Sequence, residues 1–197
     1  MPKSLGIIGT AGRKDDALKL TKQIWGLGAM QVTNVISWNK EIDAAISGGA
    51  AWADHLAVYS YLEGIVQDLT LHLPCEWDMA RNQFYDSGVF DSRQNPGGTA
   101  NYYHRKFSLK YGKNSLLEIS QAIQKGAKVV VTNGFLNRNT KVANESDVLL
   151  ALTFGEKEKI KDGGTADTAR KYLQREIKHS LYHYNLNDCI LYSNGRA

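Results

Sequence analysis

The sequence has few cysteines, few prolines and no long apolar run. Its two cysteines, Cys75 and Cys189, lie far apart and match no metal-type spacing, which is typical of a protein from a reducing compartment. No apolar run approaches the roughly 18 residues that a membrane-spanning helix requires, and no signal-peptide core follows Met1. We therefore expect a soluble, cytoplasmic protein without a membrane partner.

The sequence also lacks a strong excess of either charge. Its 24 Lys and Arg residues against 20 Asp and Glu residues leave a net charge of +4. This excess suits an anionic ligand but is smaller than that of a dedicated DNA-binding domain, so nucleic acid is an unlikely partner. A hydrophobic fraction of 43% and a charged fraction of 22% are ordinary for a globular protein. The length of 197 residues fits one domain with a single core.

Strands and helices alternate along most of the chain. Short apolar runs predict strands at residues 5–8, 42–46, 68–73, 127–132 and 148–154, with a further candidate at 189–192. Helical periods follow these runs, at about 51–63, 114–126 and from 166 onward, while residues 28–39 fit neither period and are expected to form a loop or an irregular helix. Such alternation predicts an α/β three-layer fold with a mainly parallel sheet.

The last predicted helix continues through residues 172–184 and carries His179 and His183 at an i,i+4 spacing. That spacing can bind a metal. Because no further acidic or histidine partner lies nearby in the sequence, we expect a solvent-facing pair and no metal site.

Three glycine-containing turns follow predicted strands. They are Gly9 to Arg13, Ser47 to Ala50, and Gly163 to Thr165. A glycine turn that begins a helix offers free backbone N–H groups to an anion at close range, although glycine is also common at any strand-to-helix corner. The convergence of three such turns at one sheet edge predicts a phosphate site. The candidate ligand-binding residues are Gly9, Thr10, Gly12, Arg13, Ser47, Gly48, Gly49, Gly163, Gly164 and Thr165.

Neither of the common nucleotide motifs is present at the first turn. It matches neither the dinucleotide fingerprint G-x-G-x-x-G nor the P-loop, so no nicotinamide cofactor and no kinase-type ATP site is expected. Arg13, at the end of this turn, is suited to bind an anion bidentately. Its alternative role is a surface salt bridge.

Acidic and aromatic residues near the strand ends are candidates for chemistry. Asp54 either caps N–H groups of its helix or accepts hydrogen bonds from ribose hydroxyls. Glu76 and Asp78 follow the strand at 68–73 as candidate acid/base groups, and Trp77 is a candidate stacking surface for a base. The alternative for such a Glu/Asp pair is a solvated loop.

Residues 79–112 interrupt the alternating pattern. They lack a clear period, which predicts a long inserted loop, and loops of this length are usually functional. The second half mixes basic and aromatic residues from Tyr102 to Phe107, Arg105 among them, a mixture that suits stacking on a base and contact with phosphate. A lid over the ligand is our preferred interpretation, and a subunit contact is the alternative.

The three turns, together with Ala51-Trp52-Ala53-Asp54, Arg138-Asn139 and Ser146-Asp147, resemble the SLOG superfamily of Rossmann-like domains. That superfamily includes the Lonely Guy phosphoribohydrolases, the DNA-processing protein A domain and nucleotide-sensing modules of bacterial and phage conflict systems. The resemblance covers most of the chain except residues 79–112. It implies a Rossmann-like parallel sheet, phosphate and ribose bound at the turns beside Arg138 and Asn139, and a homodimer or higher homo-oligomer.

One departure from the hydrolases bears on activity. They carry an Arg-Lys pair and then Pro-Gly-Gly-x-Gly-Thr-x-x-Glu, whose glutamate acts on the N-glycosidic bond. Here Arg138 matches the arginine, Asn139 replaces the lysine, and Thr168 stands where the glutamate would be. The turn is also lengthened by residues 156–162. A threonine cannot act as a base at neutral pH, so hydrolysis by this route is not expected.

The sequence therefore favours a protein that binds a small phosphorylated nucleotide or a nucleotide-derived signal, ADP-ribose-like or cyclic, as a sensor or sequestering protein. The enzyme alternative is N-glycosidic hydrolysis of a nucleoside 5′-monophosphate, with Arg138 on the phosphate or ribose and Asp167 or Glu76 as the acidic group. Binding of single-stranded DNA ranks last, because few basic residues are clustered.

Overall fold

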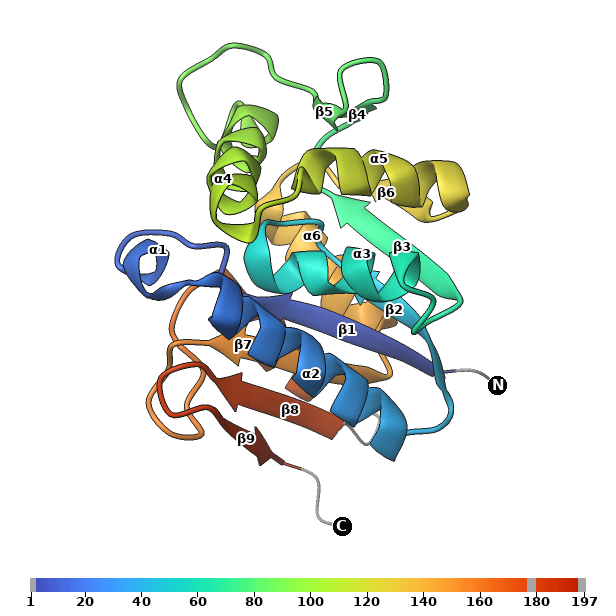
Figure 1. The fold of residues 1–197 in the computed structure, drawn as a ribbon, viewed down its shortest axis with the longest axis vertical. Helices are drawn as coiled ribbons and strands as arrows, with labels where there is room; N and C mark the ends of the chain where they lie inside the picture. Colours follow the sequence, from blue (N-terminus) through green and yellow to red (C-terminus); the bar gives the residue numbers. More distant parts are fainter. Residues whose placement is uncertain (1–2, 177–179, 195–197) are drawn as a thin grey trace.

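In the computed structural model of the chain, which describes residues 3–176 and 180–194, one seven-stranded sheet forms the centre of the molecule (Figure 1). The strand order is β6-β3-β2-β1-β7-β8-β9, and each pair is parallel except β8 with β9. The strands are β1 (Lys3–Gly9), β2 (Ile42–Ser47), β3 (Asp68–Leu73), β6 (Lys128–Val131), β7 (Val148–Thr153), β8 (Ser180–Asn185) and β9 (Ile190–Ser193). The predicted α/β fold with a mainly parallel sheet is confirmed.

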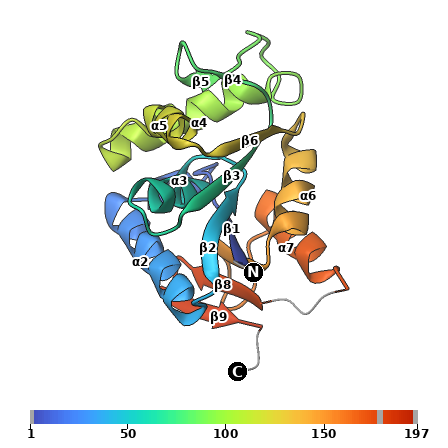
Figure 2. The same cartoon turned by 90° about the vertical axis from the view of Figure 1, so that its right-hand side faces the viewer.

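Helices cover both faces of the sheet, which gives the three layers of a Rossmann-like fold (Figure 2). On one face lie α2 (Lys22–Trp38) and α3 (His55–Leu62), and on the other lie α6 (Phe135–Glu145) and α7 (Gly164–Leu173). Because both faces are covered, the central strand β7 is buried along its whole length. None of the helices in the described part of the chain is long and apolar enough to cross a lipid bilayer.

Residues 28–39, which the sequence left between loop and irregular helix, belong mostly to the regular helix α2. Thr21 caps this helix by accepting a hydrogen bond from the Ile24 amide at 3.2 Å. Gly28, Val32 and Val35 recur at spacings of four and three and are buried. The helical period is present but weak, because β-branched and polar residues alternate with this buried stripe.

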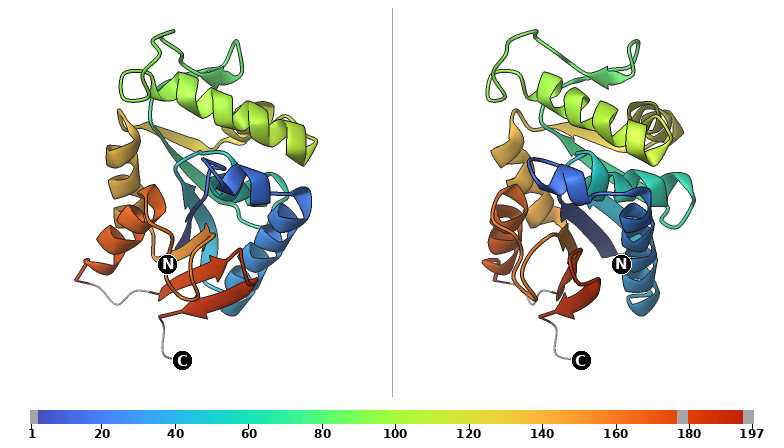
Figure 3. Two further views of the ribbon diagram at one scale, coloured as in Figure 1. Left: turned by 90° about the vertical axis from the view of Figure 1, so that its left-hand side faces the viewer. Right: turned by 60° about the vertical axis from the view of Figure 1, so that its left-hand side comes forward.

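The prediction of a long loop at residues 79–112 holds for residues 85–95 and is wrong for residues 96–111, which form a helix. After the hairpin of β4 (Trp77–Asp78) and β5 (Gln83–Phe84), the 16-residue helix α4 (Pro96–Tyr111) lies next to α5 (Ser115–Lys125) (Figure 3). Asn95 caps α4 by accepting from the Gly98 amide at 3.0 Å, and Pro96 occupies the first turn.

An aromatic cluster joins α4 to the rest of the core. The rings of Phe107 and Tyr111 stack with centroids 4.9 Å apart, and Trp25 and Trp52 pack against them. Phe107 is completely buried. The inserted segment is therefore an integral layer of the domain, which the sequence could not reveal because the ring partners come from distant segments.

The C-terminal region also differs from the prediction. Helix α7 ends at Leu173, and residues 180–185 form β8, which is hydrogen-bonded to β7 on one side and β9 on the other. His183 lies on β8 and is buried, so it does not belong to a solvent-facing helical pair; His179 lies outside the described residues. The candidate strand at 189–192 corresponds to β9. Cys75 and Cys189 are both free thiols.

We predict that α4 contributes to global stability. Phe107→Ala removes a fully buried ring and is expected to lower the free energy of unfolding by about 3–5 kcal/mol. Leu109→Ala on the same helix is the matched control, because Leu109 is 86% exposed, and it is expected to cost less than about 0.5 kcal/mol. Urea denaturation followed by circular dichroism measures both. Equal, small effects would show that α4 is not part of the cooperative core.

Candidate functional site

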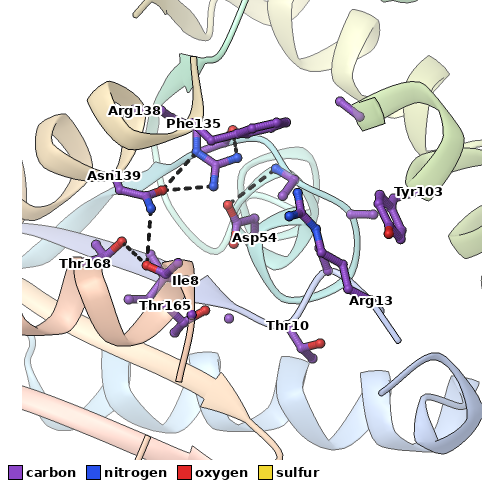
Figure 4. A pocket seen from close by; sticks show the side chains of 18 of the residues that line it. Ile8, Thr10, Arg13, Asp54, Tyr103, Phe135, Arg138, Asn139, Thr165 and Thr168 are labelled. Atoms are coloured by element: carbon purple, nitrogen blue, oxygen red, sulfur yellow. Dashed lines mark hydrogen bonds between the residues drawn. The ribbon is translucent and has the colours of Figure 1, made fainter. Parts of the chain in front are cut away.

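A cleft of about 490 Å³ opens at the carboxyl ends of β1, β2 and β7 (Figure 4). All three glycine turns contribute to its lining, through residues 9–11 and 13, 48–51 and 163–165. They meet because β1 lies between β2 and β7 in parallel register, with Ile7 opposite Ser47 and Gly9 opposite Leu152. Parallel strands end at the same edge of a sheet, so the turns that follow them share that edge.

Two of the candidate residues shape the turns from behind and do not line the cleft. Ser47 is completely buried; its hydroxyl donates to the Asp54 carbonyl at 2.9 Å and accepts from the Gly49 amide at 3.1 Å. Gly12 has a φ of +74°, and a Cβ there would lie only 2.8 Å from the Trp52 indole nitrogen. Both residues are required by turn geometry.

Asp54 lies in the floor of the cleft and is 4% exposed. The Ala50 amide donates to its carboxylate at 3.4 Å. Burial raises the pKa of Asp54, while the charge of Arg138 and the amides of Ala50, Gly9 and Gly48 act in the opposite direction. The Asp54 carboxylate therefore interacts with the amides of the first two glycine turns from the floor of the cleft.

Arg138 and Asn139, at the start of α6, link two of the turns. Arg138 donates to the Gly48 carbonyl at 3.3 Å, and its Nη2 donates to the Asn139 side-chain oxygen at 3.0 Å. The Asn139 side-chain NH₂ in turn donates to the Gly164 carbonyl at 3.2 Å (Figure 4). Asparagine both accepts and donates here, whereas a lysine has no acceptor. Asn139 thus forms a polar bridge between Arg138 and the start of α7.

The guanidinium of Arg138 is suited by its surroundings to interact with an anion. Burial lowers its pKa from the ordinary value, the charge of Asp54 raises it, and the charge of Arg13 lowers it. An arginine stays cationic at neutral pH under such shifts, and partial desolvation strengthens its interaction with an anion.

Aromatic rings line the mouth of the cleft. The Phe135 ring lies 5.3 Å from the guanidinium carbons of both Arg13 and Arg138, and the Tyr103 ring lies 5.3 Å from that of Arg13. These separations are typical of cation–π contacts. The segment that was predicted as a lid therefore contributes Tyr103, on α4, to the mouth of the cleft (Figure 4).

Five candidate residues, Glu76, Trp77, Asp78, Arg105 and Asp167, lie away from the cleft, and none of them is among the described residues that line it. Asp78 forms an ion pair with Arg81 at 3.2 Å. The Trp77 indole donates to the Ser120 hydroxyl at 3.1 Å and packs edge-on against Phe84, and Glu76 is exposed beside it. Arg105 donates to Gln83 at 3.1 Å, and Asp167 forms ion pairs with Arg170 and Lys171. The expectation that Trp77 and Glu76 border the crevice fails because the chain turns away after Pro74 into the β4–β5 hairpin.

Sequence reasoning missed several residues of the cleft. Phe135 precedes Arg138 by three positions at the start of α6, and this helical spacing was a usable signal. Asp16 and Lys161 carried no such signal, because they are 145 residues apart and meet only in the folded chain.

Thr168 does line the cleft, where its hydroxyl donates to the Gly164 carbonyl at 2.9 Å.

The inserted helix α4 also supports the second glycine turn. His104 on α4 is completely buried, and its Nε2 donates to the Gly49 carbonyl at 3.0 Å. Its Nδ1 is then free to accept from the Ser115 hydroxyl at 2.9 Å. Both ring nitrogens are thus used by the neutral imidazole, and protonation of Nδ1 would turn it from an acceptor into a donor to Ser115 and place a charge in a buried site.

The fold and the site define an α/β protein with a cationic, aromatic-rimmed cleft at the carboxyl edge of a parallel sheet. An uncharacterized protein of Acanthamoeba polyphaga mimivirus is 39% identical over 183 residues, which cover 89% of this chain and 91% of the viral protein. The chain belongs to the same family as this mimivirus protein. No protein-family model matches the sequence. Within residues 3–176 and 180–194, no three His, Cys, Asp or Glu side chains are grouped so as to hold a metal ion.

The buried state of His104 predicts a pH dependence of stability. Burial lowers its pKa from 6.5 to about 3, so the unfolded chain binds more protons than the native chain between these values. The contribution of His104 is complete above pH 6.5 and is lost as the pH falls toward 3, with a slope of up to about 1.4 kcal/mol per pH unit.

Urea denaturation of wild type and His104→Gln at several values between about pH 7 and pH 5 measures this contribution, because most carboxylates stay ionised in that range. The free energy of unfolding of the wild type is expected to fall more steeply than that of the variant as the pH is lowered. Identical slopes would contradict the assignment to His104.

Proposed function

We propose that the protein binds a nucleotide or a nucleotide-derived signalling molecule, such as an ADP-ribose-like or cyclic species, and acts as a sensor or sequestering protein. The observation that carries the proposal is the convergence of three glycine turns, Arg13 and Arg138 on one cleft of about 490 Å³. This volume lies in the range of small-molecule sites, roughly 300–1,000 Å³. We further propose that the chain is a member of the SLOG superfamily, because its glycine turns resemble those of that superfamily. With this membership we propose that the protein is a homo-oligomer in the cytoplasm.

The start of α7 and Arg138 are suited to hold the phosphate. Gly163 caps α7 without a side-chain hydrogen bond, and Gly164 and Thr165 line the cleft. An uncapped helix N-terminus offers N–H groups and a partial positive charge to an anion. Each charge-assisted hydrogen bond contributes roughly 1.5–3 kcal/mol, so three or four such bonds are enough for affinity of about micromolar.

The rings at the mouth are suited to hold a base. Tyr103 and Phe135 come from α4 and α6 and face Arg13 between them. Ring faces of this kind stack on any nucleobase, with a contribution of about 1–3 kcal/mol per base. The guanidinium of Arg13 lies against these faces, and it would turn toward the phosphate when a base takes its place.

Binding without hydrolysis is favoured by the state of the acidic groups. Thr168 uses its hydroxyl on the Gly164 carbonyl, Asp167 is neutralised by Arg170 and Lys171, and Glu76 is exposed away from the cleft. Neither Asp167 nor Glu76, the two acids named for the phosphoribohydrolase alternative, is among the described residues that line the cleft, which supports binding without hydrolysis.

The test is a thermal-stability screen with ADP-ribose, cyclic nucleotides and nucleoside mono- and diphosphates. At a concentration of 100 times its Kd, a ligand stabilises the native state by about 2.7 kcal/mol, which appears as a rise in Tm. Arg138→Gln is expected to weaken binding about 10- to 100-fold through the loss of charge-assisted hydrogen bonds. Arg170→Gln is the control, because Arg170 has a 65% exposed side chain outside the cleft.

Two outcomes would count against the proposal. The absence of a Tm rise with every phosphorylated nucleoside would reject nucleotide binding. Mass spectrometry of the ligand after incubation separates binding from turnover: intact ligand is expected, and released base would instead support the hydrolase.

A further inference from the structure

The turn after β7, which residues 156–162 lengthen, is anchored against β8. The Asn185 side chain donates to the carbonyls of Gly155 and Lys157 at 3.2 and 2.9 Å. His183 donates from Nδ1 to the Glu158 carbonyl at 3.1 Å, and Asn185 and His183 are both buried. This segment is therefore held in one place by side chains of the core.

The anchoring places Lys161 against the cleft. The Thr153 hydroxyl accepts from the Lys161 amide at 3.2 Å, and the Lys161 ammonium lies 2.5 Å from Asp16. The other carboxylate oxygen of Asp16 accepts from the Thr10 hydroxyl at 2.7 Å. Thr10, Asp16 and Lys161 all line the cleft, and Asp16 is only 6% exposed. A buried carboxylate and a hydroxyl from the segment after β1 and an ammonium from the segment after β7 thus form one cluster.

This cluster retains hydrogen-bonding capacity. Each carboxylate oxygen accepts two hydrogen bonds and an ammonium donates three, so after the contacts to Thr10 and Lys161 both groups have positions left for a ligand. A carboxylate repels phosphate. A neutral hydroxyl, by contrast, donates to the carboxylate and accepts from the ammonium at the same time. The cluster is therefore complementary to sugar hydroxyls.

One member of the cluster, Thr10, lies away from Arg138 and Asn139, whereas Lys161 comes two residues before Gly163 at the start of α7. Figure 4 shows Thr10 on the opposite side of Asp54 from Arg138 and Asn139. The cleft consequently has a cationic end at Arg138 and a mixed-charge end at Asp16. A ligand that carries an anionic group and a sugar with free hydroxyls matches this division.

We propose that Thr10, Asp16 and Lys161 form a sugar-hydroxyl subsite through which the cleft selects ribonucleotides over deoxyribonucleotides. This inference rests on the proposed nucleotide site and specifies its ligand class. The Asp16 carboxylate accepts hydrogen bonds from the sugar hydroxyls, and the lengthened turn places Lys161 beside it.

The test uses isothermal titration calorimetry with the 5′-diphosphates of the four common nucleosides, each in ribo, 2′-deoxy and 2′,3′-dideoxy form. In the wild type the ribo form is expected to bind at least about tenfold more tightly than the dideoxy form, because the buried carboxylate loses its partners. Asp16→Asn is expected to reduce this ratio to within about threefold by weakening the ribo form alone.

Matched controls separate recognition from folding. Asp15→Asn changes the neighbouring exposed carboxylate, which lies outside the cleft, and should leave the ratio unchanged. Lys161→Met removes an ammonium on a side chain that is 44% exposed, and it should also lower the ratio, whereas Lys159→Met should not. The wild-type series and Lys161→Met keep the test decisive if Asp16→Asn does not fold.

The outcomes distinguish the inference from the function on which it rests. Equal affinity of the wild type for ribo, deoxy and dideoxy forms would overturn the hydroxyl subsite and leave the nucleotide site standing. A wild-type preference that survives both Asp16→Asn and Lys161→Met would overturn the assignment to this cluster. Failure of all twelve diphosphates to bind would overturn the subsite, and failure of ADP-ribose, the cyclic nucleotides and the monophosphates as well would overturn the nucleotide site.

Discussion

The cleft depends on the close approach of three backbone segments at Gly9. A Cβ at this position would overlap the Leu152 carbonyl of β7 and the Ala53 side chain. Because glycine has no such atom, the Thr10 amide reaches the Leu152 carbonyl at 2.9 Å, and the Ala53 amide reaches the Thr10 carbonyl at 3.3 Å. These contacts hold the first turn against β7 and against the segment that follows the second turn, so both turns face the same space.

Polar bridges between distant elements then set the shape of this space. Arg138 and Asn139 connect the Gly48 carbonyl of the β2 turn to the Gly164 carbonyl at the start of α7, and His104 connects α4 to Gly49. Side chains fixed in this way lose little freedom when a ligand binds, which reduces the entropic cost of association. The inserted segment thus supports the cleft through a buried histidine as well as bordering it through Tyr103.

The distribution of charge within the cleft gives it a direction. Arg13 and Arg138 flank the Phe135 ring, whereas Asp16 lies with Thr10 and Lys161. Anionic groups are attracted to the first set and repelled by the carboxylate of the second. The net charge of the chain does not reveal this separation of charges within the cleft, because the chain as a whole is only mildly basic.

The sequence by itself determined the alternation of elements, and with it the parallel sheet and the common edge of three glycine turns, because strand and helix periods and glycine conformations are local properties. Tertiary structure decided what local periods do not encode. Helix α4 depends on rings from Trp25 and Trp52, and β8 depends on hydrogen bonds to β7 and β9. The pairing of Asp16 with Lys161 across 145 residues likewise exists only after the chain has folded, since side chains so distant in sequence meet through packing alone.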